Sequence, residues 1–294
     1  MRVWIAAVLA MLMLTSCSEV EETPPLVLST DVWIGTAPLY YAYAMGWLKA
    51  ANIQMLQAES IDDNLEHYNS KAADIITGTA HEYRRLLLIH PDLIPIIIYD
   101  RSYGGDVVLS NRTLAQIRHS SENIDVYVEE NTVSEEMLNY FWSENNLSKQ
   151  RFTLCDRKQD EIETLMASPL TPPTIAVTYN PHDTILKKQG FFELTSSKND
   201  RYLIVDGIYV SSELAHKHSK QMVALRNAFG AAVRAYHHNP KAFYDTVKPY
   251  LGNVSYEEFG KMVHNIQWME DHNLTLKMLQ QLQQNHFPTQ DLIP

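Results

Sequence analysis

Cysteine is scarce in this sequence, with two residues in 294, Cys17 and Cys155. So few thiols exclude the disulfide framework that holds many small secreted domains together. Basic residues are also in deficit: 24 Lys and Arg stand against 35 Asp and Glu, for a net charge of −11. Because an acidic surface repels phosphate, we expect no nucleic acid partner.

Long hydrophobic runs are missing after the first few residues. The longest, Leu93–Tyr99, has the length of a strand and contains Pro95, whereas a membrane-spanning helix needs roughly 20 apolar residues. Common enzyme motifs are missing too: there is no Walker loop, no dinucleotide-binding glycine fingerprint, no His-Glu-x-x-His and no Gly-x-Ser-x-Gly. The 12 histidines are poorly spaced for metal ligation. We therefore expect no catalytic set, no metal site and no cofactor.

The first residues follow the pattern of a secretory signal peptide. Arg2 precedes an apolar run that ends in Leu14-Thr15-Ser16-Cys17. This ending resembles the bacterial lipobox, whose cysteine becomes the lipidated first residue; an ordinary signal with an incidental cysteine is the alternative. The stretch after Cys17 is polar, as a tether should be. We expect a signal peptide at 1–16, a lipidated tether at 17–25, and attachment to the cell-envelope membrane by acyl chains alone.

Strand-like and helix-like segments alternate through the rest of the chain. Strands are expected at 26–32, 53–58, 73–77, 93–99, 107–109, 124–128, 151–155, 174–178 and 203–210. Helices are expected at 38–50, 62–70, 80–89, 134–145, 160–167, 183–189, 212–237, 240–250, 256–267 and 274–284. Such alternation predicts mostly parallel sheets covered by helices on both faces.

Two series of these units predict two α/β lobes joined by two crossovers. We place lobe 1 at 26–108 and 205–294, and lobe 2 at 109–204. Cys155 falls in an expected strand, where we interpret it as a small apolar core thiol. Ligands of open α/β sheets collect at the carboxyl ends of the strands, so a cleft between the lobes is the expected site.

Three groups of polar and aromatic residues follow expected strand ends. Trp33, in the segment Asp31–Pro38, offers a flat face for stacking on a ligand, or else belongs to the core. The segment Ser102-Tyr103-Gly104-Gly105-Asp106 combines a hydroxyl, a carboxylate and backbone amides that glycine leaves accessible, or else forms a simple turn. In Val128–Ser134, free amides at a helix start could hold a polar group, or Thr132 and Ser134 merely cap the helix.

These segments resemble one family of extracytoplasmic solute-binding proteins. Trp33–Tyr40 followed by Gly46-Trp47-Leu48 is similar to the family's opening, and Ser102–Asp106 is similar to its Ser-x-Gly-Gly-Asp segment. Ala176–Pro181 and Ile204–Asp206 are similar to the segments that close the second lobe and return from it. The family is the nitrate/sulfonate/taurine and thiamine-pyrimidine-precursor type of ABC-transporter binding proteins, the NMT1/THI5-like group. Tyr127, where its members usually carry glycine, is a departure.

The resemblance implies a two-lobed type II periplasmic binding protein fold that closes on a small molecule. It also implies a periplasmic location, an ABC transporter permease as partner, and a monomer. The acids and aromatics at the expected site favour a nitrogen-containing ligand. A periplasmic sensor that reports to a membrane protein is an alternative function. An enzyme of the pyrimidine-synthase or menaquinone-pathway type on the same fold is a less favoured one.

Roles for the ligand-binding residues follow from their side chains. We expect Trp33 to stack, Ser102, Gly105 and Asp106 to form hydrogen bonds, and Glu129 or Glu130 to accept from an amine or a ring N–H. We expect Thr132 to contact an oxygen, Tyr179 to close the far wall, and Asp206 to lie near the hinge. Weaker candidates follow the third strand: Thr79 and Glu82, of which Glu82 could simply complement its helix dipole.

Overall fold

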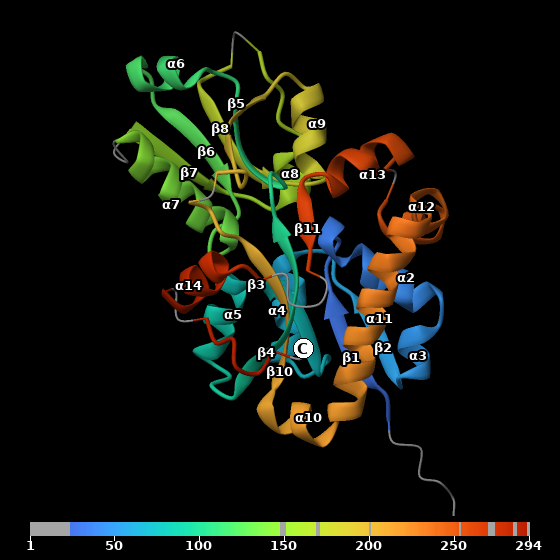
Figure 1. The fold of residues 1–294 in the computed structure, drawn as a ribbon. Coiled ribbons are helices and arrows are strands. Elements are labelled where there is room, and N and C mark those ends of the chain that lie inside the picture. The colour runs from blue at the N-terminus through green and yellow to red at the C-terminus, as the bar shows by residue number, and fades with distance from the viewer. Residues whose placement is uncertain are drawn as a thin grey trace, which may run out of the picture.

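Two separate β-sheets divide the chain into two lobes (Figure 1). The computed structural model describes residues 24–147, 151–168, 171–199, 201–252, 254–269, 274–284 and 287–292. The expected signal peptide and Cys17 lie outside these residues. No helix in the described part of the chain is both long and apolar enough to cross a membrane.

The first lobe is built on a six-stranded sheet in the order β11-β4-β10-β3-β1-β2. Its strands are β1 (Leu26–Thr30), β2 (Ile53–Gln57), β3 (Ile75–Thr79), β4 (Leu93–Ser102), β10 (Val205–Ser211) and β11 (Ile266–Trp268). β1 runs parallel to β2 and β3, whereas β10 runs antiparallel to both β3 and β4. The strand that arrives from the other lobe is therefore inserted against the direction of its neighbours.

The second lobe repeats this plan in a five-stranded sheet of order β7-β6-β8-β5-β9. Its strands are β5 (Asp106–Ser110), β6 (Ile124–Val128), β7 (Phe152–Asp156), β8 (Thr174–Tyr179) and β9 (Phe192–Ser196). β6 is parallel to β7 and β8, and β5, which arrives from the first lobe, is antiparallel to β8 and β9. The expected two-lobed α/β architecture with two crossovers is confirmed.

Helices cover the sheets of both lobes. Around the first sheet lie α2 (Ala37–Ala44), α3 (Trp47–Ala50), α4 (Ile61–Asn69), α5 (Ala80–Leu87), α10 (Ser212–Lys217), α11 (Ser219–His238), α12 (Pro240–Val247), α13 (Tyr256–Val263) and α14 (Leu276–Gln284). Around the second lie α6 (Leu114–His119), α7 (Val133–Asn145), α8 (Gln159–Ile162) and α9 (His182–Lys188). Two 3₁₀ turns, Ile34–Thr36 and Lys248–Tyr250, complete the described elements.

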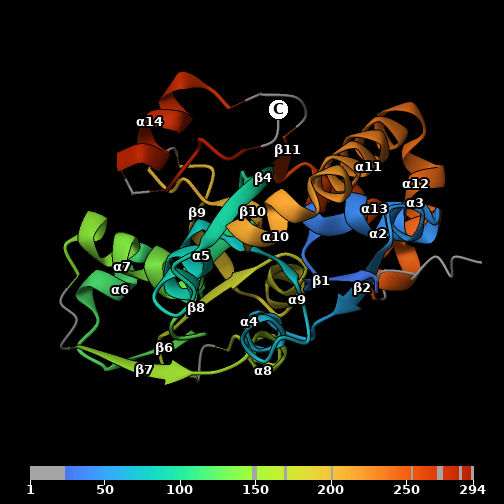
Figure 2. The same cartoon turned by 90° about the horizontal axis from the view of Figure 1, so that it is seen from below.

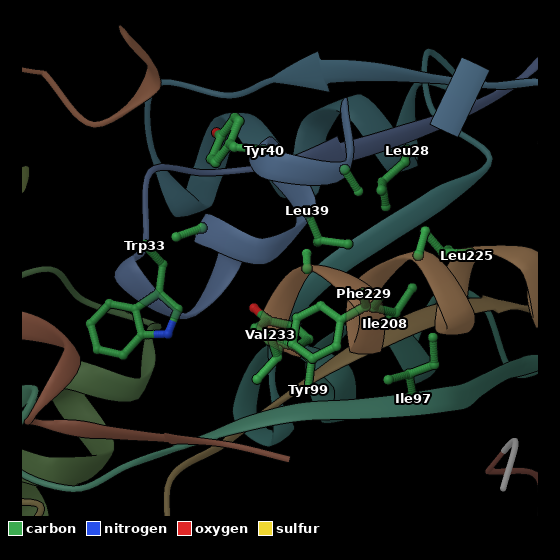
Figure 3. Close-up of a cluster of buried hydrophobic side chains, with 14 of the residues drawn as sticks. Leu28, Trp33, Leu39, Tyr40, Ile97, Tyr99, Ile208, Leu225, Phe229 and Val233 are labelled. Atoms are coloured by element: carbon green, nitrogen blue, oxygen red, sulfur yellow. The ribbon is translucent and has the colours of Figure 1, made fainter. Parts of the chain in front are cut away.

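The largest hydrophobic cluster lies in the first lobe between its sheet and α2, α11 and α12. Figure 2 shows these helices gathered beside β1 and β2. Figure 3 shows Trp33 at the end of the cluster, set apart from Tyr99 and Phe229.

Two helix starts are encoded by local sequence. Thr79 and Glu82 form a reciprocal capping box at α5, and Thr113 and Gln116 form one at α6. A capping box satisfies backbone amides that have no partner at a helix start.

Several local expectations differ from the structure. Cys155 is not a core thiol: it is partly exposed, because β7 is the edge strand of its sheet and most of its side chains reach solvent. The helix expected to reach 267 ends at Val263, and the chain then adds β11 to the free edge of β4. β9 was not expected as a strand. Ser102 ends β4 and Asp106 begins β5, so the chain changes sheets before the expected boundary at 108.

Candidate functional site

A small cavity of about 30 Å³ lies between the two lobes, next to both crossovers. The first lobe and the returning crossover contribute Asp31, Trp33, Ile61, Asn64, Leu65, Thr77, Gly78, Thr79, Glu82, Ile204 and Asp206 to its lining, and the second lobe contributes Asp106, Val133 and Tyr179. The cavity therefore lies at the carboxyl ends of strands, as expected for an α/β sheet. No lysine, arginine or histidine is among these lining residues.

Trp33 belongs both to the core and to the cavity wall. It is 7% exposed and sits at the edge of the first lobe's hydrophobic cluster. Its indole Nε1 donates to Asp100 Oδ2 over 2.7 Å, and its ring meets Tyr179 of the second lobe edge-on at 6.0 Å. Gly35 makes room for this hydrogen bond, since a Cβ there would come within 1.3 Å of Asp100 Oδ2. Trp33 is therefore a core residue that also lines the cavity, and its stacking on a ligand stays a prediction.

Asp100 and Asp206 form a buried acid pair behind Trp33. They face each other across the antiparallel pairing of β4 and β10. Burial, and then the charge of Asp100, raise the pKa of Asp206 well above its ordinary value. Burial also raises the pKa of Asp100 to about 6, although hydrogen bonds from Asp206 and Trp33 act to lower it. Two carboxyls in such contact share one proton near neutral pH. Asp206 also lines the cavity.

The two crossovers are tied together by a serine pair. The hydroxyls of Ser102 and Ser197 lie 2.7 Å apart, and Ser197 Oγ also accepts from the Gly104 amide at 2.7 Å. The Asp106 amide donates to Ser102 Oγ over 3.2 Å. Ser102 therefore contacts the hinge rather than the cavity lining. Ser197, the partner of Ser102, was missed in the sequence because nothing in its local pattern marks it.

Gly105 lies beside this serine pair, and the indole of Trp33 packs against its backbone. A Cβ at Gly105 would approach Trp33 Cη2 to 2.6 Å and Ser102 Oγ to 3.1 Å. Its carbonyl accepts from the Asn180 amide at 3.0 Å. Glycine here allows the close approach of Trp33 to the crossover.

Glu129 of the second lobe is a buried acid that is not among the residues lining the cavity. Glu129 is 3% exposed at the end of β6; Gln159 Nε2 lies 3.4 Å from its Oε2, and its Oε1 has no partner among the described residues. Burial raises the pKa of Glu129 to about 7, and the charges of Asp62, Glu82 and Asp31 in the first lobe add to the shift. Glu130 is half-buried and does not line the cavity; its amide donates to Asp156 Oδ1 on the β7 side.

Thr79, Glu82 and Thr132 serve mainly as helix caps. Glu82 Oε2 accepts from the Thr79 amide at 3.0 Å, and Glu82 Oε1 accepts from the Val133 amide of the other lobe at 3.1 Å. Thr132 caps α7 and donates to the Glu129 carbonyl at 2.7 Å. The Glu82 carboxylate thus supports a helix start in each lobe and bridges the cleft, a role beyond the one weighed in the sequence.

Two lining residues, Asp31 and Asn64, were not selected from the sequence. Asp31 follows β1 directly. Burial raises its pKa to about 7; a hydrogen bond to its own backbone lowers the pKa, and the charges of Glu82 and Asp100 raise it further. Asn64 is 4% exposed; its Nδ2 donates to the Thr77 carbonyl at 2.8 Å, and its Oδ1 has no partner among the described residues. Asp31 could have been found from its position at a strand end. Asn64 depends on how α4 packs on β3.

A wider mouth of about 570 Å³ shares Asp31 and Tyr179 with the cavity and opens between the lobes. Lys188 of α9 and Glu258 of α13 both line this opening, and they form an ion pair across it with an N–O distance of 2.5 Å. On another side, His81 and Arg84 of α5 each contact Glu136 of α7 at 2.7 Å. Ion pairs therefore connect the two lobes at two places. Among the described residues, no group of three or more His, Cys, Asp or Glu is arranged to hold a metal ion.

Comparison with known proteins identifies the fold. No family model and no curated protein sequence match the chain. Solved structures do match. The alkanesulfonate-binding protein SsuA from Xanthomonas axonopodis pv. citri, bound to MOPS, aligns with a TM-score of 0.71 and 12% identity over 90% of this chain and 91% of that one.

The ligand-binding component of an ABC-type import system from Staphylococcus aureus, with zinc bound, gives a TM-score of 0.69 and 12% identity over 92% of this chain and 97% of that one. The desulfurization enzyme DszB aligns with a TM-score of 0.62 and 14% identity over 92% of this chain and 95% of that one. The chain has the two-lobed periplasmic binding protein fold. At these identities the likeness shows the fold alone, and that fold carries both binding proteins and an enzyme.

Gly105→Ala is expected to destabilise the protein by about 1–3 kcal/mol, because the added methyl group overpacks the contact between Trp33 and the crossover. Urea denaturation followed by circular dichroism measures the change. Gly260→Ala is the control: it lies in α13, where an added Cβ meets nothing within 4 Å, so it should be neutral or stabilising by up to about 1 kcal/mol. Equal stability of the two variants would contradict this packing role.

The melting temperature is expected to fall as the pH rises from 5 to 8. Burial raises the pKa of Asp31, Asp106 and Glu129 to about 7 from ordinary values of 3.8 to 4.5. These groups hold protons in the folded state that the unfolded chain releases. Their contribution to stability is therefore complete below about pH 4 and is lost as the pH passes through 7.

Asp106→Asn should flatten this pH dependence, because the amide cannot become a buried charge. Differential scanning calorimetry across the pH range provides the measurement. The control is Asp245→Asn, which alters a carboxylate that is 54% exposed beside Lys241 and should leave the slope unchanged. A slope in Asp106→Asn as steep as in the wild type would show that other groups cause it.

Proposed function

We propose that this protein is a periplasmic solute-binding lipoprotein that captures a small, polar, nitrogen-containing molecule and delivers it to an ABC transporter permease. One observation carries the proposal: a small cavity lined by carboxyl groups and apolar side chains lies between two lobes that are connected by two crossovers. Such lobes can separate and close by bending at the crossovers. The structural neighbours that bind ligands for import support this function.

The ligand contacts in this proposal are a subset of those expected from the sequence. Trp33 and Tyr179 supply apolar walls from opposite lobes, and Asp106 and Asp206 supply acceptors from the cavity lining. Glu129, which is buried outside that lining, is a further proposed acceptor. Ser102 and Gly105 act by shaping the hinge and by seating Trp33. Thr79, Glu82 and Thr132 position the helix starts that frame the cavity.

We propose that the bound molecule leaves unaltered. Two carboxyls at the site already have structural tasks: Glu82 accepts from amides in both lobes, and Asp100 holds the indole of Trp33. The enzyme among the structural neighbours makes turnover the outcome that would contradict this part.

Native mass spectrometry of protein prepared from its own cell envelope tests solute capture. The expected result is a retained small molecule that dissociates from the protein unchanged. When added back at 100 times its dissociation constant, it should stabilise the fold by about 2.7 kcal/mol. Asp106→Ala should lose this effect, and Asp245→Ala should keep it. A preparation without any retained solute, or one that converts the solute, would contradict the proposal.

Cys17→Ser tests the lipid anchor. Metabolic labelling with palmitate should label the wild-type protein, which should fractionate with membranes; the variant should lose both properties. Cys155→Ser is the matched control, because Cys155 lies in β7 of the folded second lobe, and it should keep label and location. Loss of label in Cys155→Ser rather than in Cys17→Ser would contradict the assignment.

A further inference from the structure

The cavity has an imbalance of charge. Asp31, Glu82, Asp106 and Asp206 line it, and no lysine, arginine or histidine is among its lining residues. Glu82 is held by backbone amides, and Asp206 shares a proton with Asp100. Asp106, which is buried, and Asp31, which is half-buried, remain as carboxyls without a cationic partner in the lining. Burying a carboxylate without a partner is costly, so a positive charge would be bound favourably here.

A second observation, independent of charge, concerns hydrogen bonding. Asn64 lines the cavity and is 4% exposed, and its Oδ1 has no partner among the described residues. Because its Nδ2 already donates to the Thr77 carbonyl at 2.8 Å, the orientation of the amide is fixed and its oxygen is an acceptor. Buried acceptors of this kind call for donors.

We propose that the cavity binds a small organic cation that carries N–H donors, an ammonium or a guanidinium group. The inference rests on the proposed solute-binding function and narrows its ligand class. A sulfonate or a carboxylate would meet acids and no lysine or arginine. A quaternary ammonium has the charge but no N–H, so it would leave Asn64 Oδ1 unsatisfied. Charge and donor count together select the N–H cation.

Binding of such a cation is coupled to proton release. Burial raises the pKa of Asp31 and Asp106 to about 7, and a cation beside them stabilises the carboxylates and lowers both values. The affinity therefore rises with pH. A neutral ligand that accepts hydrogen bonds from protonated acids would show the opposite slope. The sign of the pH dependence thus distinguishes a cation from a neutral solute.

Isothermal titration calorimetry of the full-length protein, cleared of retained solute, is the test. The compounds are methylguanidine, 1,4-diaminobutane, tetramethylammonium, methanesulfonate, cytosine and zinc ion. We expect methylguanidine or 1,4-diaminobutane to bind, with an affinity that rises at least about tenfold from pH 6 to pH 8, because Asp31 and Asp106 together release one to two protons with pKa values near 7. Tetramethylammonium should bind at least tenfold more weakly, and the remaining compounds should not bind.

Two variants localise the effect. Asp106→Asn should weaken binding at pH 8 at least tenfold and reduce its pH dependence. Asn64→Leu should weaken methylguanidine and leave the weaker binding of tetramethylammonium unchanged, since only the former donates to Oδ1. Circular dichroism checks that each variant is folded, and the wild-type pH dependence is a measure that requires no variant. Asp245→Asn, on the surface beside Lys241, should bind like the wild type.

The failures are distinguishable. Binding of methanesulfonate or cytosine in place of the cations would overturn this inference and leave solute capture standing. Equal affinity for tetramethylammonium and methylguanidine would overturn the requirement for N–H donors, and preferential binding of zinc would overturn an organic ligand. Binding of none of these compounds overturns the inference as well. If the native protein also retains no solute, the proposed function fails with it.

Discussion

The hydrogen bond from the Trp33 indole to the Asp100 carboxylate determines how the two lobes meet. Asp100 lies in β4, directly before the first crossover, and its position fixes the indole at the edge of the first lobe's core. The ring then reaches Gly105 on the crossover and Tyr179 in the second lobe. Two glycines make this possible, because a side chain at either Gly35 or Gly105 would collide with the Trp33–Asp100 unit.

The crossovers add a second constraint of the same kind. β5 and β10 each enter a sheet antiparallel to both of their neighbours. The Ser102 amide donates to the Ile204 carbonyl, and the Ser197 amide donates to the Asp106 carbonyl, so the two connections are joined at both ends. The two crossovers are therefore hydrogen-bonded to each other and form one hinge rather than two independent linkers. A bend there moves one whole lobe relative to the other.

Sequence patterns predicted the architecture well, because strands and helices alternate with clear periodicity and the lobe changes are marked by glycine and by short polar turns. Trp33, Asp106, Tyr179 and Asp206 were selected from the sequence and all line the cavity. Trp33 follows β1 and Tyr179 ends β8, whereas Asp106 and Asp206 lie at the starts of β5 and β10, at the crossovers. Their contact with a ligand stays a prediction. Sequence patterns could not predict Asn64 or Ser197, whose roles arise from contacts between distant elements. Thr132 illustrates the reverse: a polar residue at a strand end turned out to cap its own helix.

Errors in secondary structure have a common physical origin. The helix expected to reach residue 267 ends early because the free edge of β4 accepts three more residues as β11, and backbone pairing with β4 outweighs local helical periodicity. Cys155 was placed in a core because its strand is apolar, but burial depends on the position of the strand in the sheet, and β7 is at the edge. Sheet order cannot be read from one strand.

Closure and charge are coupled in this fold. The charges of Asp31 and Glu82 from the first lobe act on Glu129 of the second and raise its pKa, so bringing the lobes together brings acids together. Opposing this repulsion are the amide of Val133 on Glu82 and the ion pairs of Glu136 and Glu258 at the rims. A ligand shifts the equilibrium between separated and closed lobes only by the difference in its affinity for these two forms. A cation bound between the acids, as proposed above, would have that difference, because it would offset the repulsion among the acids that approach one another when the lobes close. Charge compensation would then drive closure of the lobes, and the rim contacts would add to it.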